Sequence, residues 1–548
     1  MESNTPQSRR PRRLLVFAVL LLLLNLLLLG MLFYGRFSRS GGGFRMLLPQ
    51  SKLQRVLRLV SAAYVDSVSL SDLEEKAIPE VIGQLDPHSS YIPAEEMAQV
   101  AEPLRGDFDG IGVTFNMLTD TVIVQSIIAG GPSERAGVQI GDRFIRVDTT
   151  KIAGVKMPQD SVVHLLRGPR GTLVTVHAER PGVEQEVVFE IRRDKIPINS
   201  VEIAYMATEK VGVIRLSRFA QTTPQDFQEA VIRLAAQGME ALVLDLRDNG
   251  GGFLEAAKFI ASLFLQQGQL IVYTEGRASG RHDLICESEG SLRNIPLSIV
   301  INEFSASASE IVAGAMQDND RALIVGRRSF GKGLVQEQFE FPDGSGLRLT
   351  TSRYYTPSGR CIQKAYTLGD EAGYEQELGA RFAHGELLDA DSIHQDTLQR
   401  FHTVGGRTVY GGGGIMPDVF VPIDTTGVTP FYQQVTRRVL HFRYAQRYAD
   451  AHREALKGLD SPEAMRRWLQ EHNAFGDFLQ YLASQGVRPK GRISPETRRL
   501  LEIQLFANIA RSVHDNAWFY LMIQDIDTTL QKAVEVLEKP EKYPLAAV

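Results

Sequence analysis

The sequence predicts a multi-domain protein in which an N-terminal transmembrane helix and a helical segment precede α+β and α/β domains and a helical C-terminal domain. Three observations predict this fold class. An uncharged apolar run occupies residues 14–34, strands alternate with helices between residues 211 and 341, and only helical apolar spacing continues after about residue 425. Alternating strands and helices are typical of a parallel sheet with covered faces. The 548 residues allow about three or four domains.

The composition excludes several function classes. A net charge of −5 gives no sign of nucleic-acid binding. Two cysteines, Cys286 and Cys361, cannot form a disulfide framework, and their positions leave open whether they pair. The sequence contains no H-E-x-x-H, C-x-x-C or EF-hand spacing. We therefore expect no metal, no cofactor and no nucleic-acid partner.

Residues 1–43 predict a cytoplasmic tail, a membrane anchor and a linker. Four arginines between residues 9 and 13 precede the apolar run 14–34, which is 21 residues long. About 20 apolar residues cross a bilayer, and flanking arginines stay on the cytoplasmic side. A cleaved signal peptide is the alternative, but its apolar core would be shorter, about 7 to 15 residues. We expect a retained anchor, with everything after Gly35 outside the cytoplasmic membrane.

Residues 44–105 predict an N-terminal helical region. A dense apolar stripe runs from Leu53 to Val60, and the phrase Leu85-Asp-Pro-His-Ser-Ser-Tyr91 closes the region. Its His88 stands alone, so we interpret it as structural.

Residues 106–197 predict short strands and one helix. A strand begins at Gly110-Ile-Gly-Val113, the segment 122–128 pairs with it, and residues 158–166 form the helix. Successive amides of a glycine-rich turn can hold a carboxylate, and a peptide can add as a strand beside residues 110–116. A small β-domain with ordinary glycine turns is the alternative.

Residues 198–425 predict an α/β core. Strands at 211–218 and 241–246 flank a helix at 223–236, and Gly250-Gly-Gly252 follows the second strand. Ligand chemistry in such sheets lies beyond the carboxyl ends of the strands. A glycine turn there offers free backbone amides, as an oxyanion hole requires, or it simply starts the next helix.

The segment 302–336 contains the parts for nucleophilic catalysis. Serines alternate at Ser305, Ser307 and Ser309 before an apolar helix, and Lys332 lies on a glycine-rich turn after the next short strand. These parts suit a hydroxyl nucleophile activated by an amine base.

Two other interpretations compete for this segment. Ser307-Ala-Ser-Glu310 also fits a helix capping box. Residues 326–332 fit G-x-x-x-x-G-K, the start of a phosphate-binding loop. That loop needs Ser or Thr where Gly333 stands, and a helix where we expect a strand at 334–341. The nucleotide interpretation is therefore disfavoured.

The segment 302–336 resembles the active-site region of the carboxyl-terminal processing peptidases, also called tail-specific proteases. The alternating serines, Glu-Ile, an Ala-Gly helix and F-G-K-G-x-V-Q carry the resemblance, which extends over residues 50–425. It implies a crotonase-like α/β peptidase core with Ser307 as nucleophile and Lys332, 25 residues later, as general base. It also implies that Gln336 orients the lysine.

The same resemblance implies an oxyanion hole. Ala308 would donate one amide, and either Gly251 or Gly252 would donate the other. The family phrase D-L-R-x-N-P-G-G has a proline where this chain has Gly250, so this turn is less rigid.

Residues 106–197 resemble a PDZ domain. The elements G-I-G-V, A-G-(x)n-G-D and R-G-P-x-G-T occur in order. The resemblance implies that Ile111, Gly112 and Val113 supply amides to the carboxylate of a substrate tail. It also implies that Arg167 couples tail binding to the active site.

Residues 426–548 predict a helical C-terminal domain. Four stretches carry helical apolar spacing, at 429–454, 462–485, 494–513 and 516–538. This domain is the candidate surface for a homo-oligomer.

We therefore expect a single-pass protein of the cytoplasmic (inner) membrane with its catalytic part in the periplasm. Its PDZ domain would bind the free C-terminal tails of protein substrates, and a Ser–Lys dyad would cleave them as a serine endopeptidase. The alternative is a non-catalytic, membrane-anchored PDZ scaffold on a peptidase fold. The joint presence of Ser307, Lys332 and Gln336 argues against the scaffold.

Overall fold

The computed structural model describes residues 51–117, 120–393 and 398–544. The expected anchor at 14–34 lies outside these ranges. Within them, no helix is both long enough and apolar enough to cross a membrane. The chain divides into two compact units, Met1–Glu80 and Val81–Val548.

Helices dominate the described residues before Gly106, as the sequence predicts. They are α2 (Lys52–Ala63), α3 (Leu70–Ile82) and α4 (Met97–Arg105). Ser51 caps α2, because its hydroxyl accepts the N–H of Gln54 and the Gln54 side chain accepts the N–H of Ser51. A short strand, β1 (Ser90–Ile92), was not predicted.

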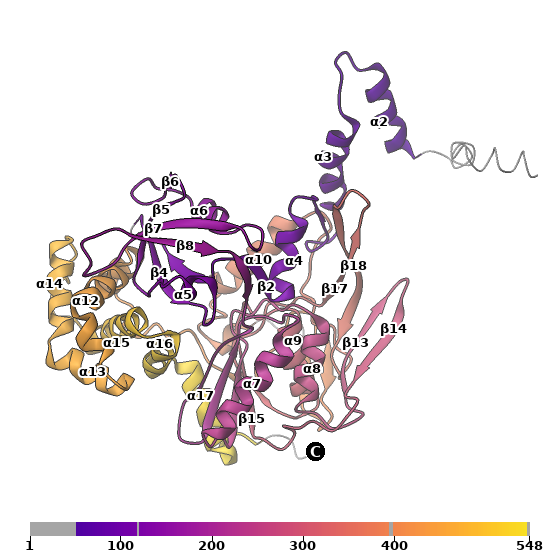
Figure 1. The fold of residues 1–548 in the computed structure, drawn as a ribbon. Helices are drawn as coiled ribbons and strands as arrows, with labels where there is room; N and C mark the ends of the chain where they lie inside the picture. The colour runs from indigo at the N-terminus through magenta and orange to yellow at the C-terminus, as the bar shows by residue number, and fades with distance from the viewer. Residues whose placement is uncertain (1–50, 118–119, 394–397, 545–548) are drawn as a thin grey trace, which may run out of the picture. The chain divides into compact units, whose positions relative to one another are not determined.

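The domain at 106–197 is a six-stranded antiparallel sheet with two helices (Figure 1). Its path is β3 (Val113–Asn116), β4 (Val122–Ile127), β5 (Arg143–Val147), β7 (Leu173–Glu179) and β8 (Val187–Arg192), with β6 (Thr150–Lys151) beside β5. The helices are α5 (Pro132–Arg135) and α6 (Gln159–Leu166). The predicted pairing of β3 with β4 is confirmed, and β3 is an edge strand. Outside this sheet, β2 (Asp107–Gly110) pairs with β9 (Asp194–Pro197).

The core at 198–425 contains a second six-stranded sheet, parallel except at one edge. Its order is β10 (Val201–Met206), β11 (Val211–Leu216), β12 (Ala241–Asp245), β15 (Leu297–Ile301), β16 (Leu323–Gly326) and β21 (Val419–Phe420). Only β10 runs antiparallel to its neighbour. Every residue of β12 and β15 is buried, as expected for strands covered on both faces.

Helices from different parts of the chain cover the two faces of this sheet. One face packs against α7 (Thr223–Ala236), α8 (Leu254–Ser262) and α9 (Ala308–Asp318). The opposite face packs against α17 (Thr528–Glu538), through Leu530, Ala533 and Val536. In Figure 1 the strand β15 lies between α17 and the helices α8 and α9. The last α-helix that the structure describes is therefore part of the core packing.

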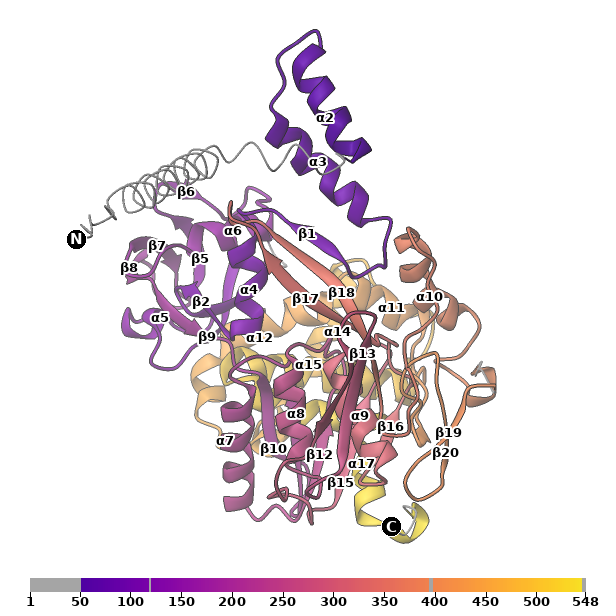
Figure 2. The ribbon, with the colours of Figure 1, turned by 90° about the vertical axis from the view of Figure 1, so that its right-hand side faces the viewer.

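A further sheet, with five strands, lies beside the core sheet. It runs β1, β18 (Gly346–Tyr355), β13 (Leu270–Gly276), β14 (Gly280–Ile285), and β17 (Leu334–Glu340) also pairs with β18. The remaining described elements of the region are α10 (Glu371–Ala383), η1 (Ala390–Ser392), β19 (Arg400–His402) and β20 (Thr408–Tyr410). Figure 2 shows β17 and β18 side by side. The strand predicted at 334–341 is confirmed.

The C-terminal helices confirm the predicted helical region but are more broken than expected. They are α11 (Pro430–Arg437), α12 (Leu440–Lys457), α13 (Pro462–Glu471), α14 (Ala474–Ser484), α15 (Pro495–Val513), α16 (Asn516–Ile523) and α17, with short 3₁₀ turns η2 (Gln524–Ile526) and η3 (Pro540–Lys542). Val439 and Asn473 take left-handed conformations, each with φ of +53°. These residues end one helix and begin the next, so two predicted stretches each form a pair of helices.

Candidate active site

Three serines lie between β15 and α9, and the structure gives them different surroundings. Ser305 and Ser309 are fully buried, and their hydroxyls donate to the carbonyl oxygens of Leu246 at 2.8 Å and Asn249 at 2.9 Å. Ser307 alone of the three is partly exposed. The outer serines therefore fasten this turn to the segment after β12, and only Ser307 can meet a substrate.

Ser307 has an unusual backbone conformation. It is the N-cap residue of α9, with φ of +56° and ψ of −114°. Such a conformation costs about 1–3 kcal/mol in a residue other than glycine, and it persists only where neighbours enforce it. Strain of this kind is common at functional sites, and here it falls on the serine that the sequence singles out.

Glu310 enforces this conformation. Its Oε2 accepts the N–H groups of Ser307 and Lys332, both at 2.8 Å. Its Oε1 accepts the N–H of Gly331 at 2.8 Å and the hydroxyl of Ser329. Burial raises the pKa of Glu310 to about 7, and the four donors oppose that rise. The glutamate half of the predicted capping box is therefore present, and it also holds the lysine turn.

Lys332 lies on the loop between β16 and β17. Burial lowers the pKa of its amine, and the positive charge of Arg348 acts in the same direction, whereas Glu310 and Asp86 oppose the shift. The hydroxyl of Tyr354 contacts the carbonyl oxygens of both Lys332 and Ser307. A strand follows this loop, not the helix that a phosphate-binding loop requires, so the nucleotide interpretation is wrong.

Gln336 lies on β17, and a hydrogen-bond chain that begins at its amide nitrogen fixes the orientation of its side chain. Its Nε2 donates to the hydroxyl oxygen of Thr350 at 3.2 Å, and that hydroxyl donates to Oδ1 of Asp86 at 2.8 Å. Because a carboxylate only accepts, Asp86 fixes the direction of the chain. The Oε1 of Gln336 is thereby left as the acceptor for another donor.

His88 is held as a neutral imidazole. Burial lowers its pKa to about 4, and the charge of Lys332 contributes in the same direction. Its Nε2 lies 3.1 Å from the hydroxyl oxygen of Tyr374. These surroundings agree with the structural role that the sequence suggests.

The glycine turn after β12 approaches the serine turn closely. Gly251 has φ of +99°, and a Cβ built on it would lie 2.7 Å from the Cβ of Ser307. Its N–H donates to Oδ1 of Asn249 at 2.9 Å. In the part of the chain that the structure describes, the N–H groups of Gly252 and Ala308 have no acceptor. Gly252, not Gly251, therefore keeps an amide available for a ligand.

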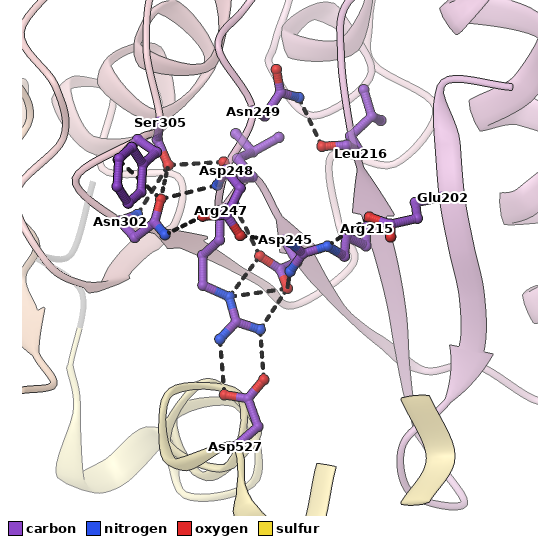
Figure 3. Close-up of polar contacts among 12 residues, drawn as sticks. Glu202, Arg215, Leu216, Asp245, Arg247, Asp248, Asn249, Asn302, Ser305 and Asp527 are labelled. Atoms are coloured by element: carbon purple, nitrogen blue, oxygen red, sulfur yellow. Dashed lines mark hydrogen bonds and ion pairs between the residues drawn. The ribbon is translucent and has the colours of Figure 1, made fainter. Parts of the chain in front are cut away.

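The glycine turn is held from below by charged side chains (Figure 3). The guanidinium of Arg247 contacts Asp245 at 2.7 Å and Asp527 at 2.7 Å. Arg215 pairs with Asp245 at 3.1 Å and with Asp248 at 2.8 Å. The sequence pattern marked the glycines of this turn but not the charged side chains around it. Asp527 carried no signal because its partner Arg247 is 280 residues away.

The expected tail-binding residues lie on the loop between β2 and β3. The carbonyl oxygen of Ile111 accepts both the N–H and the hydroxyl of Ser133, and that of Gly112 accepts the N–H of Ile128 at 3.0 Å. Gly112 has φ of +77°, which favours glycine. Val113 begins the edge strand β3, where a peptide could add as a further strand.

Arg167 contacts neither Ser307 nor Lys332. Its Nη1 donates to Glu102 on α4 at 2.5 Å, and its guanidinium lies over the ring of Phe108, 4.4 Å from the centroid. The structure therefore links Arg167 to the helical segment before β2.

Neither cysteine pairs, and both Cys286 and Cys361 are free thiols. Among the described residues, no group of three or more His, Cys, Asp or Glu side chains is placed to hold a metal ion.

Comparison with known proteins identifies two domains. Residues 210–371 match peptidase family S41, and residues 110–191 match the PDZ domain. This chain contains an S41 peptidase domain and a PDZ domain. Ser307, Lys332 and the glycine turn all fall inside the S41 match. Residues 431–515 match a family of unknown function, DUF8443.

Two curated proteins are similar to this chain over part of their length. The chain is 35% identical over 314 residues to a "Probable CtpA-like serine protease" of Staphylococcus aureus (strain bovine RF122 / ET3-1). It is equally similar to a protein of the same name from Staphylococcus epidermidis (strain ATCC 12228 / FDA PCI 1200). Each match covers 57% of this chain and 62% of the relative, less than two thirds of its length. A solved photosystem II D1 C-terminal processing protease is 27% identical, with 67% of this chain and 92% of that chain covered and a TM-score of 0.35.

Proposed function

We propose that this protein is a serine endopeptidase that captures the free carboxyl terminus of protein substrates in its PDZ domain and cleaves them with Ser307 and Lys332. The observation that carries the proposal is the shared contact with Glu310, which holds both residues at one site at the carboxyl edge of the core sheet. The S41 and PDZ matches support the same class of activity.

The first half of the reaction follows from the surroundings of the dyad. Burial favours the neutral amine of Lys332, which takes the proton of Ser307 while Oγ attacks the scissile carbonyl. The N–H groups of Gly252 and Ala308 stabilise the oxyanion that develops. The lysine ammonium then gives its proton to the leaving amine, and an acyl-enzyme remains on Ser307.

In the second half, neutral Lys332 takes a proton from water as the water oxygen attacks the acyl group. The lysine ammonium then gives this proton to Ser307 Oγ as the acyl bond breaks, which releases the product and restores both residues. The oxygen of Gln336 would accept an N–H of the lysine amine, and the chain through Thr350 to Asp86 at the other end of its amide supports this role. The role of Gln336 is thus to orient the base.

Substrate selection would begin at the PDZ domain. The loop with Ile111, Gly112 and Val113 would hold the tail carboxylate, and β3 would pair with the tail as an added strand. Arg167 would report tail binding through Glu102 and Phe108 rather than by contact with the dyad.

We also propose that residues 14–34 anchor the protein in the cytoplasmic membrane, with the peptidase in the periplasm. The uncharged run of 21 residues behind four arginines supports this topology. Protease added to intact spheroplasts should digest everything after Gly35, and the full-length protein should resist carbonate extraction. A soluble form beginning near residues 36–43 would mean that the segment is a cleaved signal.

A homo-oligomer through residues 426–548 stays a prediction.

Fluorophosphonate labelling tests the enzymatic function against the scaffold alternative. The wild-type protein should be labelled on Ser307, identified by mass spectrometry, and should cleave a protein with an unstructured tail. Ser307→Ala should lose both properties. Ser309→Ala is the matched control, because its buried hydroxyl serves only the fold, and its folded fraction should keep most activity. No labelling and no cleavage by the wild type would favour the scaffold.

A further inference from the structure

We propose that Asp527, at the start of α17, is a positioning residue for the glycine turn at 245–252. By this inference the C-terminal helical region takes part in peptide hydrolysis, although it lies outside the S41 match. The inference rests on the proposed function.

The guanidinium of Arg247 links the glycine turn to α17, because both Asp245 and Asp527 bind it (Figure 3). Arg247 donates from Nη1 and Nη2 to the two carboxylate oxygens of Asp527, at 2.8 and 2.7 Å. From Nε and Nη2 it donates to the two oxygens of Asp245, at 3.0 and 2.7 Å. Both carboxylates are therefore bound in the bidentate geometry that fixes an arginine most firmly. Only 14% of the Arg247 side chain is exposed, so water screens these contacts weakly.

Arg247 belongs to the turn that carries the amide of Gly252, one of the two proposed oxyanion donors. Next to it, Asp248 and Asn302 exchange two hydrogen bonds, at 3.0 and 2.8 Å. The carbonyl oxygen of Asn249 accepts the N–H of Ala306 at 3.0 Å. A displacement of Arg247 is thus transmitted to Gly252 along the chain and to the serine turn through these bonds.

Asp527 is a fixed partner because α17 is packed on the core. Its carboxylate accepts the N–H of Leu530 at 3.0 Å and so caps the helix. Leu530, Ala533 and Val536 are buried against the core sheet, and the hydroxyl of Ser298 on β15 donates to the carbonyl of Ala533 at 3.2 Å. The sheet therefore holds α17, and α17 holds the arginine.

The fold has other support where Asp527 is lost. Arg247 keeps Asp245, and asparagine retains the helix cap because its side-chain oxygen accepts the same N–H. Asp527→Asn should therefore leave α17 in place. It should remove only the negative charge of Asp527 that binds the guanidinium of Arg247. The expected defect is a mobile glycine turn, which weakens transition-state binding more than substrate binding.

Asp515→Asn is the matched control. Asp515 caps α16 by accepting the N–H of Trp518 at 3.2 Å, and within the described ranges it forms no ion pair. The two variants share the residue type, the capping role and the C-terminal region, but only Asp527 contacts the glycine turn.

The test combines hydrogen exchange with steady-state kinetics on the full chain. In Asp527→Asn we expect faster amide exchange confined to residues 245–252, a kcat about tenfold lower per fluorophosphonate-titrated site, and KM within twofold of wild type. In Asp515→Asn we expect none of these changes. If Asp527→Asn fails to fold, Asp527→Ser, which also caps without a charge, takes its place.

Unchanged exchange at 245–252, or a rise in KM with constant kcat, would overturn the inference. Faster exchange spread over α17 and the whole core sheet would also overturn it, because it would show a purely structural role. If the wild type neither cleaves nor is labelled, the proposed function fails. The exchange comparison still decides in that case whether Asp527 orders the turn.

Discussion

Ser307 and Lys332 donate their backbone N–H groups to one carboxylate oxygen, Oε2 of Glu310, each at 2.8 Å. Two residues 25 positions apart in the chain are thereby held to a common point in the buried interior. Tyr354 adds a second link between their carbonyl oxygens. The backbone of the proposed dyad is thus fixed independently of the two reacting side chains.

Glu310→Gln should damage both stability and activity. A glutamine presents one oxygen and one NH₂ group, so two of the four donors now at Glu310 would face a donor. Leaving buried donors unpaired costs about 1–3 kcal/mol each. By denaturant titration we expect the free energy of unfolding to fall by at least about 2 kcal/mol. We also expect fluorophosphonate labelling of Ser307 to be at least about tenfold slower, which corresponds to about 1.4 kcal/mol. Glu340→Gln, at an exposed position on β17, is the control. Wild-type stability in Glu310→Gln would contradict this role.

The charge of Arg348 should set the pH range of activity. It disfavours the Lys332 ammonium and so helps to lower the lysine pKa. Arg348→Gln should raise that pKa, and the ascending limb of the kcat/KM profile should move to higher pH, because the base works only when neutral. Activity lost at neutral pH should return on the alkaline side. Arg353→Gln, on the same strand, should not move the profile.

Asp86→Asn should move the same limb in the opposite direction. The Asp86 carboxylate raises the Lys332 pKa, so its removal lowers that pKa and shifts the limb to lower pH. Asparagine can also donate to Thr350, which allows the hydrogen-bond chain to Gln336 to reverse. We therefore expect a lower maximal rate as well. A profile identical to that of the wild type would disprove the chain from Asp86 to the base.

A free tail carboxylate should be preferred over a C-terminal amide. The amide cannot accept charge-assisted hydrogen bonds from the loop at Ile111 and Gly112, each worth about 1.5–3 kcal/mol at most. We expect kcat/KM for matched peptides to fall at least about tenfold on amidation, which corresponds to about 1.4 kcal/mol. Equal values for the two peptides would exclude capture of the tail by its carboxylate.

Much of the fold was predictable because local pattern decided it. Apolar spacing gave β11, β12 and α7 within a residue or two. The G-I-G-V phrase gave β3 and its pairing with β4, although the strand begins at Val113 rather than at Gly110. The proposed nucleophile and base could be picked out from the sequence for the same reason, since serine, glutamate and lysine lie within one continuous motif. The helix breaks at Val439 and Asn473 were not, because left-handed conformations at such residues follow from packing.

The supporting residues of the site could not be predicted because their contacts join distant parts of the chain. Asp86 reaches Thr350 across 264 positions, and Arg247 reaches Asp527 across 280. Neither pair has a sequence pattern that marks it. Which glycine keeps a free amide also needed the structure, since the N–H of Gly251 donates to the side chain of Asn249.

In the proposed mechanism, neutral Lys332 is the general base for Ser307. The most direct measurement is the pH dependence of kcat/KM for the wild type beside Lys332→Arg and Lys332→Ala. The wild-type rate should rise with pH through an apparent pKa below the ordinary value for lysine, because burial disfavours the ammonium. Lys332→Arg should be as inactive as Lys332→Ala, since a guanidinium does not deprotonate in this range. Near-normal turnover by Lys332→Arg would show that only a positive charge is needed at this position, and would contradict the claim.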